Sequence, residues 1–146
     1  MQTAFDMEHP LNPAAEQIAK GTLRLLGDHG FAGVTEMTLA NGRRADIAAL
    51  GTGGEISIIE IKSCLNDFRT DKKWRDYVAY CDRFYFAVGH DFPQNVIPAE
   101  VGLIIADGFG GAILREAPLE KVAGARRKAM TLKFARLAAT RLLRSG

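Results

Sequence analysis

Residues 43–63 form the stretch that most restricts how this chain can fold. Two apolar, partly β-branched runs flank a glycine-rich break at residues 51–54, which predicts a β-hairpin. Charged residues interrupt both runs: Asp46 lies in the first, and Glu60 and Lys62 lie in the second. Charged side chains are rarely buried unless they are paired or bind a metal. We therefore interpret this hairpin as a functional site.

The rest of the chain alternates between helix and strand patterns. Asn12 and Pro13 are typical of an N-cap and a first helical residue, and apolar residues then recur at helical spacing up to the turn at residues 27–30. After this helix we expect a strand at 31–40, the hairpin, a helix from 66 or 67 to about 81, strands at 83–89, 101–107 and 112–116, and a helix at 131–144 or from a few residues earlier. A meander followed by a helical crossover predicts one α/β domain over residues 1–146, with a mixed central sheet flanked by helices.

Length and composition fit a soluble globular protein. A chain of 146 residues with 47% hydrophobic and 25% charged residues matches one ordinary domain. It has no run of 18 apolar residues, and its first ten residues lack the basic and apolar regions of a secretory signal. Cys64 and Cys81 have no metal-type spacing and are expected to be reduced thiols, as in a cytoplasmic protein.

Charge is distributed unevenly along the chain. All 17 acidic residues lie at or before Glu120, so residues 1–120, with 11 basic residues, carry −6, and the remainder carries +8. An acidic body with a basic C-terminal helix suits a metal site beside a phosphate-binding surface. The helix itself has two interpretations: it contacts DNA, or it has a solvated outer face and an apolar stripe that packs on the sheet. That stripe consists of Leu132, Ala135, Ala139, Leu142 and Leu143.

The hairpin turn sets which charged residues meet. If the turn centres on Gly53, residues whose numbers sum to 106 face each other, and Asp46 lies opposite Glu60 with Cβ atoms about 5 Å apart. Two ionised carboxylates this close repel, so either one is protonated or a cation lies between them. Lys62 lies two residues past Glu60, on the same face of the strand. A one-residue change in the turn would separate these side chains.

This set of side chains suits metal-dependent attack on a phosphate. Mg²⁺, or Mn²⁺ in its place, prefers carboxylate oxygens, polarises a phosphodiester and lowers the pKa of a bound water. Lys62 could orient that water, accept its proton or stabilise the developing charge.

Asp46, a gap of thirteen residues and then Glu60-Ile61-Lys62 resembles the signature of the PD-(D/E)XK nucleases, with Ala45 in place of the proline. The resemblance implies a restriction-endonuclease-like core in which Asp46 and Glu60 bind the catalytic metal and Lys62 serves the attacking water. It also implies that a helical glutamate, Glu16, completes the metal site.

Members similar to RecB place Gln and Tyr four residues apart on the next helix. Lys73 and Tyr77 take that spacing here, with Lys replacing Gln. Lys72, Lys73 and Tyr77 are therefore candidates for a supporting position behind the site or for phosphate contact.

A closer resemblance covers most of the chain and points to the MmcB family of bacterial DNA-repair proteins. The residues that carry it are Arg44-Ala45-Asp46-Ile47, Glu60-Ile61-Lys62-Ser63, Asp67, Asp71-Lys72-Lys73-Trp74, Tyr77, Cys81-Asp82-Arg83-Phe84-Tyr85-Phe86-Ala87-Val88 and Gly102-Leu103-Ile104-Ile105-Ala106-Asp107. The resemblance implies a role in DNA repair without fixing the reaction.

Each of these candidate residues also has a simpler interpretation. Glu60 and Lys62 could form a surface ion pair, and Glu16 could be a first-turn glutamate favoured by the helix dipole. Lys72 and Lys73 could be solvated, and Trp74 and Tyr77 could be packing anchors. The three histidines lack the spacing of a zinc site, and residues 51–54 lack the Gly-Lys-Ser/Thr of a nucleotide-binding loop.

Two functions remain open at this point. The first is a Mg²⁺-dependent DNA nuclease acting in repair. The second is a non-catalytic DNA-binding or repair-complex subunit that retains the nuclease fold. The small size favours a homodimer or a partner protein in either case.

Overall fold

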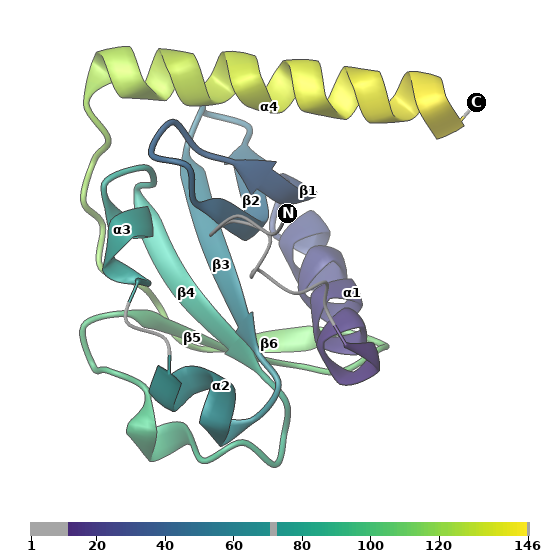
Figure 1. Ribbon diagram of the computed structural model, residues 1–146, viewed down its shortest axis with the longest axis vertical. Helices are drawn as coiled ribbons and strands as arrows, with labels where there is room; N and C mark the ends of the chain where they lie inside the picture. The colour runs from purple at the N-terminus through teal and green to yellow at the C-terminus, as the bar shows by residue number, and fades with distance from the viewer. Residues whose placement is uncertain (1–11, 71–72, 146) are drawn as a thin grey trace, which may run out of the picture.

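The computed structural model describes residues 12–70 and 73–145. Six strands form one sheet in which the spatial order follows the chain order, from β1 to β6 (Figure 1). The strands are β1 (Phe31–Thr38), β2 (Arg44–Gly51), β3 (Ile56–Lys62), β4 (Arg83–Val88), β5 (Gly102–Ala106) and β6 (Gly111–Arg115). The helices are α1 (Pro13–Asp28), α2 (Leu65–Thr70), α3 (Arg75–Val78), the 3-10 turn η2 (Gln94–Val96) and α4 (Gly124–Ser145).

The sheet is mixed, as the order of predicted elements requires. β1, β2 and β3 form an antiparallel meander, β3, β4 and β5 run parallel, and β6 returns antiparallel to β5. Parallel neighbours need a crossover connection, and α2 with α3 supplies the one between β3 and β4. The predicted α/β class, with a mixed sheet flanked by helices, is therefore confirmed.

Apolar clusters cover both faces of the sheet. In β3, Ile59 and Ile61 belong to the cluster under α1, and Ile56 and Ile58 belong to the cluster on the other face. This alternation follows from the period of two along a strand. Both faces are buried, which explains why β3 and β4 read as nearly continuous apolar runs.

Helix α1 begins where the sequence predicts. Asn12 is its N-cap and accepts a hydrogen bond from the Ala15 N–H at 2.8 Å, and Pro13 is the first helical residue. The helix ends at Asp28, and Gly30 then takes the positive φ of 81° that favours glycine. The expected cap and turn are both present.

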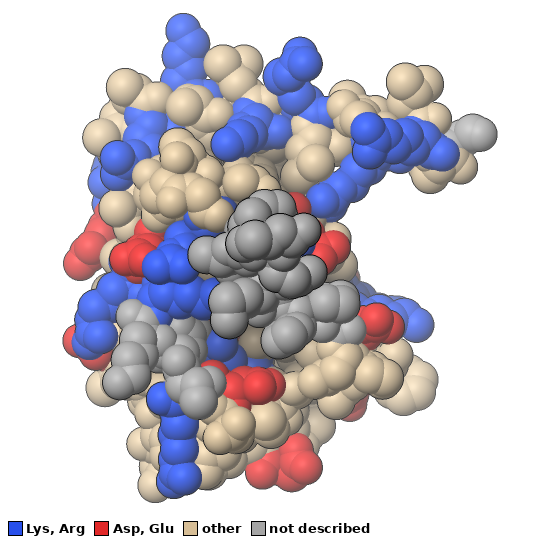
Figure 2. Space-filling view, in the orientation of Figure 1, with Lys and Arg blue, Asp and Glu red and all other residues tan. Residues whose placement is uncertain are grey.

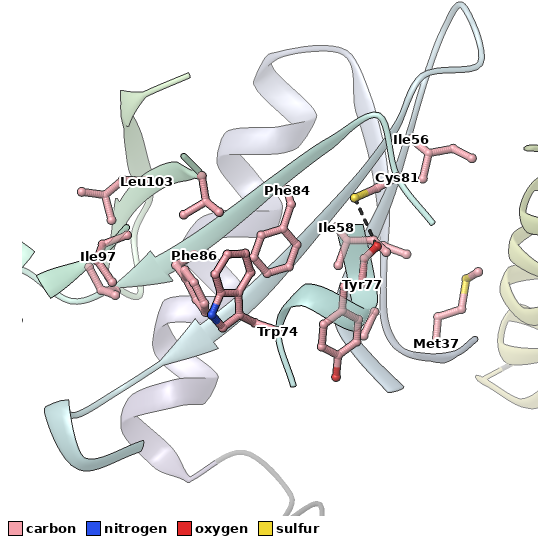
Figure 3. Close-up of a cluster of buried hydrophobic side chains, with 14 of the residues drawn as sticks. Met37, Ile56, Ile58, Trp74, Tyr77, Cys81, Phe84, Phe86, Ile97 and Leu103 are labelled. Carbon is pink, nitrogen blue, oxygen red and sulfur yellow. Dashed lines mark hydrogen bonds between the residues drawn. The ribbon is translucent and has the colours of Figure 1, made fainter. Parts of the chain in front are cut away.

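The single helix predicted from residue 66 or 67 to about 81 is wrong, because the structure has two short helices there, α2 and α3. Phe68 of α2 and Trp74 ahead of α3 both pack edge-on against Phe86, with ring centroids 5.3 and 5.8 Å away. Figure 3 shows Trp74 beside Phe86. In one straight helix, residues six apart point about 120° away from each other. Both rings reach Phe86 only because the helix is broken between them.

Trp74 and Tyr77 are packing anchors, as one interpretation of the sequence held. Both side chains are buried, and both rings stack on Phe84, with centroid distances of 5.8 and 6.1 Å (Figure 3). This aromatic group holds the crossover segment on the sheet.

Helix α4 lies across one end of the sheet (Figure 1) and begins at Gly124, earlier than residue 131. Its inner side is formed by Met130, Phe134 and Leu137, which pack against the sheet. The stripe that we expected to pack there is instead exposed, with Leu142 at 74% and Leu143 at 82%. The packing stripe of the sequence analysis is therefore wrong.

Polar contacts explain which side of α4 faces the sheet. The Arg127 guanidinium donates to the buried Asp82 carboxylate, with Nη1 and Oδ2 2.8 Å apart, and near the other end of the helix Arg141 donates to the carbonyls of Thr35 and Glu36. Asp82 also accepts from the Ile56 N–H at 2.7 Å. These two arginines fix the rotation of the helix.

No helix within residues 12–70 and 73–145 is long and apolar enough to cross a membrane.

Candidate active site

The β2–β3 hairpin has the register expected from the sequence. Ile47 pairs with Ile59, and the three pairs that follow toward the turn keep the same sum of residue numbers, so the turn centres on Gly53. Gly51 N–H donates to the Glu55 carbonyl at 2.8 Å, and Gly54 has a φ of 90°, which only glycine adopts readily. This register brings Asp46 opposite Glu60.

The two carboxylates bind the backbone of each other's strand. The Asp46 N–H donates to Glu60 Oε2 at 2.8 Å, and the Ile61 N–H donates to Asp46 Oδ2 at 2.8 Å. The Cα pairing of β2 with β3 ends one residue earlier, at Ile47 and Ile59. The side chains therefore join the strands just where the regular ladder stops, and both carboxylates are fixed by reciprocal hydrogen bonds.

Burial makes this pair chemically unusual. Only 5% of Glu60 is exposed, and Asp46 is half-buried. Two close carboxylates in a low-dielectric setting favour a bound cation or a shared proton. Mg²⁺ is commonly held by one or two carboxylates, with waters and substrate phosphates as its other ligands. The donor set of this pair fits such an ion.

Lys62 ends β3 and lies on the same side of the strand as Glu60, because the two residues are two positions apart. Glu60 pairs with Phe86 of β4, and Lys62 pairs with Val88 at the carboxyl end of that strand. Lys62 is half-buried. The geometry thus brings together Asp46, Glu60 and the last residue of β3.

Tyr77 supports the strand that carries Asp46. Its buried hydroxyl donates to the Arg44 carbonyl at 3.1 Å, two residues before Asp46. Tyr77 therefore contacts the backbone of β2 near Asp46 as well as packing on Phe84. Lys73 is half-buried between α2 and α3, and Lys72 lies outside the described residues.

The structure does not group Glu16 with this pair as a set of three metal ligands. It is exposed in the first turn of α1. In the part of the chain that the structure describes, no group of three or more His, Cys, Asp or Glu side chains is placed to hold a metal ion. The assignment of Glu16 as a third ligand stays a prediction, without support from this arrangement.

Comparison with known proteins gives a consistent result. The family model "DNA repair protein MmcB-like" matches residues 4–145. The chain belongs to this family of DNA repair proteins. No curated protein matches it. A solved structure, described as "SPO1766 protein of unknown function from Silicibacter pomeroyi", is 46% identical, with a TM-score of 0.87 over 92% of this chain and 91% of that one.

The sequence did not predict one set of polar contacts beside Lys62. Asn12 Nδ2 donates to Ser63 Oγ at 3.1 Å, and Ser63 Oγ donates to Asp67 Oδ2 at 3.2 Å. This chain of bonds joins the start of α1 and the first turn of α2 to the end of β3, directly after Lys62. The signals were present separately, since Asn12 and Asp67 are both candidate caps, but no spacing rule links residues 51 apart.

Proposed function

We propose that this MmcB-like protein is a Mg²⁺-dependent DNA nuclease that acts in repair and hydrolyses phosphodiester bonds at Asp46, Glu60 and Lys62. The observation that carries the proposal is the pair of reciprocal hydrogen bonds that holds Asp46 and Glu60 together at the end of the β2–β3 ladder. A buried carboxylate pair destabilises a fold unless a bound cation or proton offsets the repulsion.

Each residue has a distinct task in the proposed reaction. Asp46 and Glu60 would hold the ion, which supplies polarisation of the phosphodiester and a lowered pKa for a bound water. Lys62 lies at the carboxyl end of β3, where it can orient that water, take its proton or stabilise charge developing on phosphate oxygens. Tyr77 holds the β2 segment that presents Asp46.

The DNA itself would be bound by basic side chains. Helix α4 contains seven Lys and Arg residues and no acidic residue, and Figure 2 shows Lys and Arg side chains spread along it. With 100° per residue, Lys133, Arg136 and Arg144 fall within about 80° of one another on the helix, and all three are exposed. Such a side suits the phosphate backbone of DNA.

A second candidate function is DNA binding in a repair complex without catalysis. The observation that favours it is that the described residues contain no group of three acidic, histidine or cysteine ligands. The basic side of α4 would serve this function equally well.

Cleavage assays separate the two candidates. Purified protein is incubated with Mg²⁺ or Mn²⁺ and with duplex, nicked, gapped and flapped DNA. The nuclease proposal expects metal-dependent cleavage of at least one substrate, and at least a 100-fold loss in Asp46→Asn and in Lys62→Ala, since removing such a group costs about that much.

Asn can still accept from the Ile61 N–H, so Asp46→Asn keeps the hydrogen bond that organises the strand. Glu100→Gln, an exposed acid outside the site, is the matched control and should cleave normally. Cleavage that is unchanged in both site variants would refute the nuclease, and tight binding without any cleavage would favour the second candidate.

A further inference from the structure

An open pocket of about 460 Å³ lies beside the β5–β6 turn, apart from the carboxylate pair. Its volume is in the range of small-ligand sites. The residues that define it are His90, Gln94, Ile105, Asp107, Phe109 and Leu114. It combines an apolar floor with side chains able to donate and accept hydrogen bonds.

Phe109 forms an aromatic wall of this pocket and is 84% exposed. A phenylalanine that is buried removes 150–250 Å² from water, so an aromatic ring left this exposed has a large unused contact area. Hydrogen bonds hold the backbone that carries the ring. Asp107 Oδ1 accepts from the Phe109 N–H at 2.8 Å and from the Gly110 N–H at 3.1 Å.

Helix α1 fixes the same turn from the other side. A Cβ at Gly21 would lie 1.9 Å from the Asp107 carbonyl oxygen, so the turn backbone rests directly on the helix. A Cβ at Gly108 would lie 2.0 Å from Gln17 Oε1. Gly108 and Gly110, which flank Phe109, therefore lie in a turn whose backbone packs closely against α1. This packing holds the backbone that carries the Phe109 ring.

The pocket lies on the same face and at the same end of the sheet as Lys62. Lys62 pairs with Val88, and Val88 pairs with Ile105, which lines the pocket. Directly paired residues point to the same face. Two strand spacings, or roughly 10 Å, separate the backbone of Lys62 from that of Ile105.

We propose that this pocket binds an unpaired nucleobase of the DNA substrate, stacked on Phe109. The inference rests on the proposed action on DNA and specifies its substrate: DNA with a base outside the stack. Every base has a flat face that can stack on an aromatic ring. The amide of Gln94 and the imidazole of His90, whose Nε2 lies 3.4 Å from Asp107 Oδ2, offer donors and acceptors to the base edge.

The test measures binding to two fluorescein-labelled duplexes in EDTA, so that binding is separated from cleavage. One duplex is fully paired, and the other carries a single bulged 2-aminopurine. Anisotropy should show about tenfold tighter binding of the bulged duplex, in line with the contribution of one stacked base. The 2-aminopurine fluorescence should fall as the base stacks.

Variants then assign the effect to Phe109. Phe109→Ala should remove the preference for the bulged duplex and the fluorescence change, with binding of the paired duplex unaltered, and Phe109→Trp should keep both signals. Leu119→Ala removes an exposed apolar side chain outside the pocket, 52% exposed, and should behave as the unmodified protein does.

The possible failures can be told apart. Equal binding of both duplexes by the unmodified protein, or an unaltered preference in Phe109→Ala, would overturn the base pocket and leave the proposed nuclease in place. Absence of binding to either duplex would overturn both.

Discussion

At Asp46 and Glu60, each carboxylate satisfies a backbone N–H of the other strand, a role that a carbonyl has in a regular antiparallel ladder. The hydrogen bonds hold both groups at one point and leave little freedom for them to separate. Tyr77 adds a third constraint through the Arg44 carbonyl. A site fixed in this way before a ligand arrives loses little conformational entropy on binding.

The pairing of these residues could be predicted because it depends on local chain geometry. The turn at residues 51–54 sets the register, and the register decides which residues are opposite. The bond from Asn12 to Ser63 could not be predicted, because it depends on where α1 docks on the finished sheet. The position of Glu16 relative to the carboxylate pair also depends on where α1 docks, so it could not be predicted from the sequence either.

Asp82 allows a test of stability against pH. Burial alone would raise the pKa of its carboxyl, but hydrogen bonds from Arg127 and from the Ile56 and Val122 N–H groups outweigh it and lower the pKa to about 2. A carboxyl whose pKa is depressed in the folded state stabilises the fold above its unfolded pKa of about 4 and loses that effect as the pH falls through about 2.

The free energy of unfolding of Asp82→Asn should therefore be about 2 kcal/mol lower than that of the unmodified protein at pH 7. Urea titrations should show this difference shrinking between pH 4 and pH 2. A difference that stays constant from pH 7 to pH 2 would contradict the assigned ion pair.

In helix α4, the spacing of apolar residues is not sufficient to predict which side packs against the sheet. Its sequence offers two apolar stripes, one through Met130, Phe134 and Leu137 and one through Leu132 and Leu142. Either stripe could face a sheet. The choice is made by the contact of Arg127 with Asp82, 45 residues away in the chain, which local patterns do not contain. The break between α2 and α3 has the same origin, since it depends on how Phe68 and Trp74 both reach Phe86.

The exposed basic residues of α4 predict how the affinity for DNA changes with salt concentration. Replacing Lys133 and Arg136 with alanine should weaken DNA binding and reduce the slope of log K against log salt by about 2, because each phosphate contact contributes about 0.9. Binding measured at several salt concentrations between 50 and 200 mM, a range in which phosphate contacts have a large effect, provides the check.

Leu132→Ala is the matched control, because Leu132 is exposed beside Lys133 and its replacement changes no charge. Its slope should be unchanged. A slope unchanged in the double variant as well would place the DNA elsewhere on the protein.

At the scale of the whole molecule, the carboxylate pair, the open pocket and the basic helix lie on different parts of one sheet. The carboxylate pair lies at the end of the β2–β3 ladder, the open pocket lies at the carboxyl end of β5, and α4 lies across the end of the sheet (Figure 1). The acidic body and basic helix expected from the charge distribution are thus parts of one fold. The order of predicted helices and strands was sufficient to predict a mixed sheet flanked by helices, and in the structure every strand pairs with its neighbours in the chain.

The central claim is that Asp46 and Glu60 together bind a divalent cation. The most direct measurement is Mn²⁺ binding, followed by electron paramagnetic resonance of the free ion, in the unmodified protein and in Asp46→Asn/Glu60→Gln. Both substitutions keep acceptors for the two backbone N–H groups, so the fold should be retained. We predict saturable binding by the unmodified protein and at least a tenfold weaker affinity in the double variant. Equal Mn²⁺ binding by the two proteins would contradict the account.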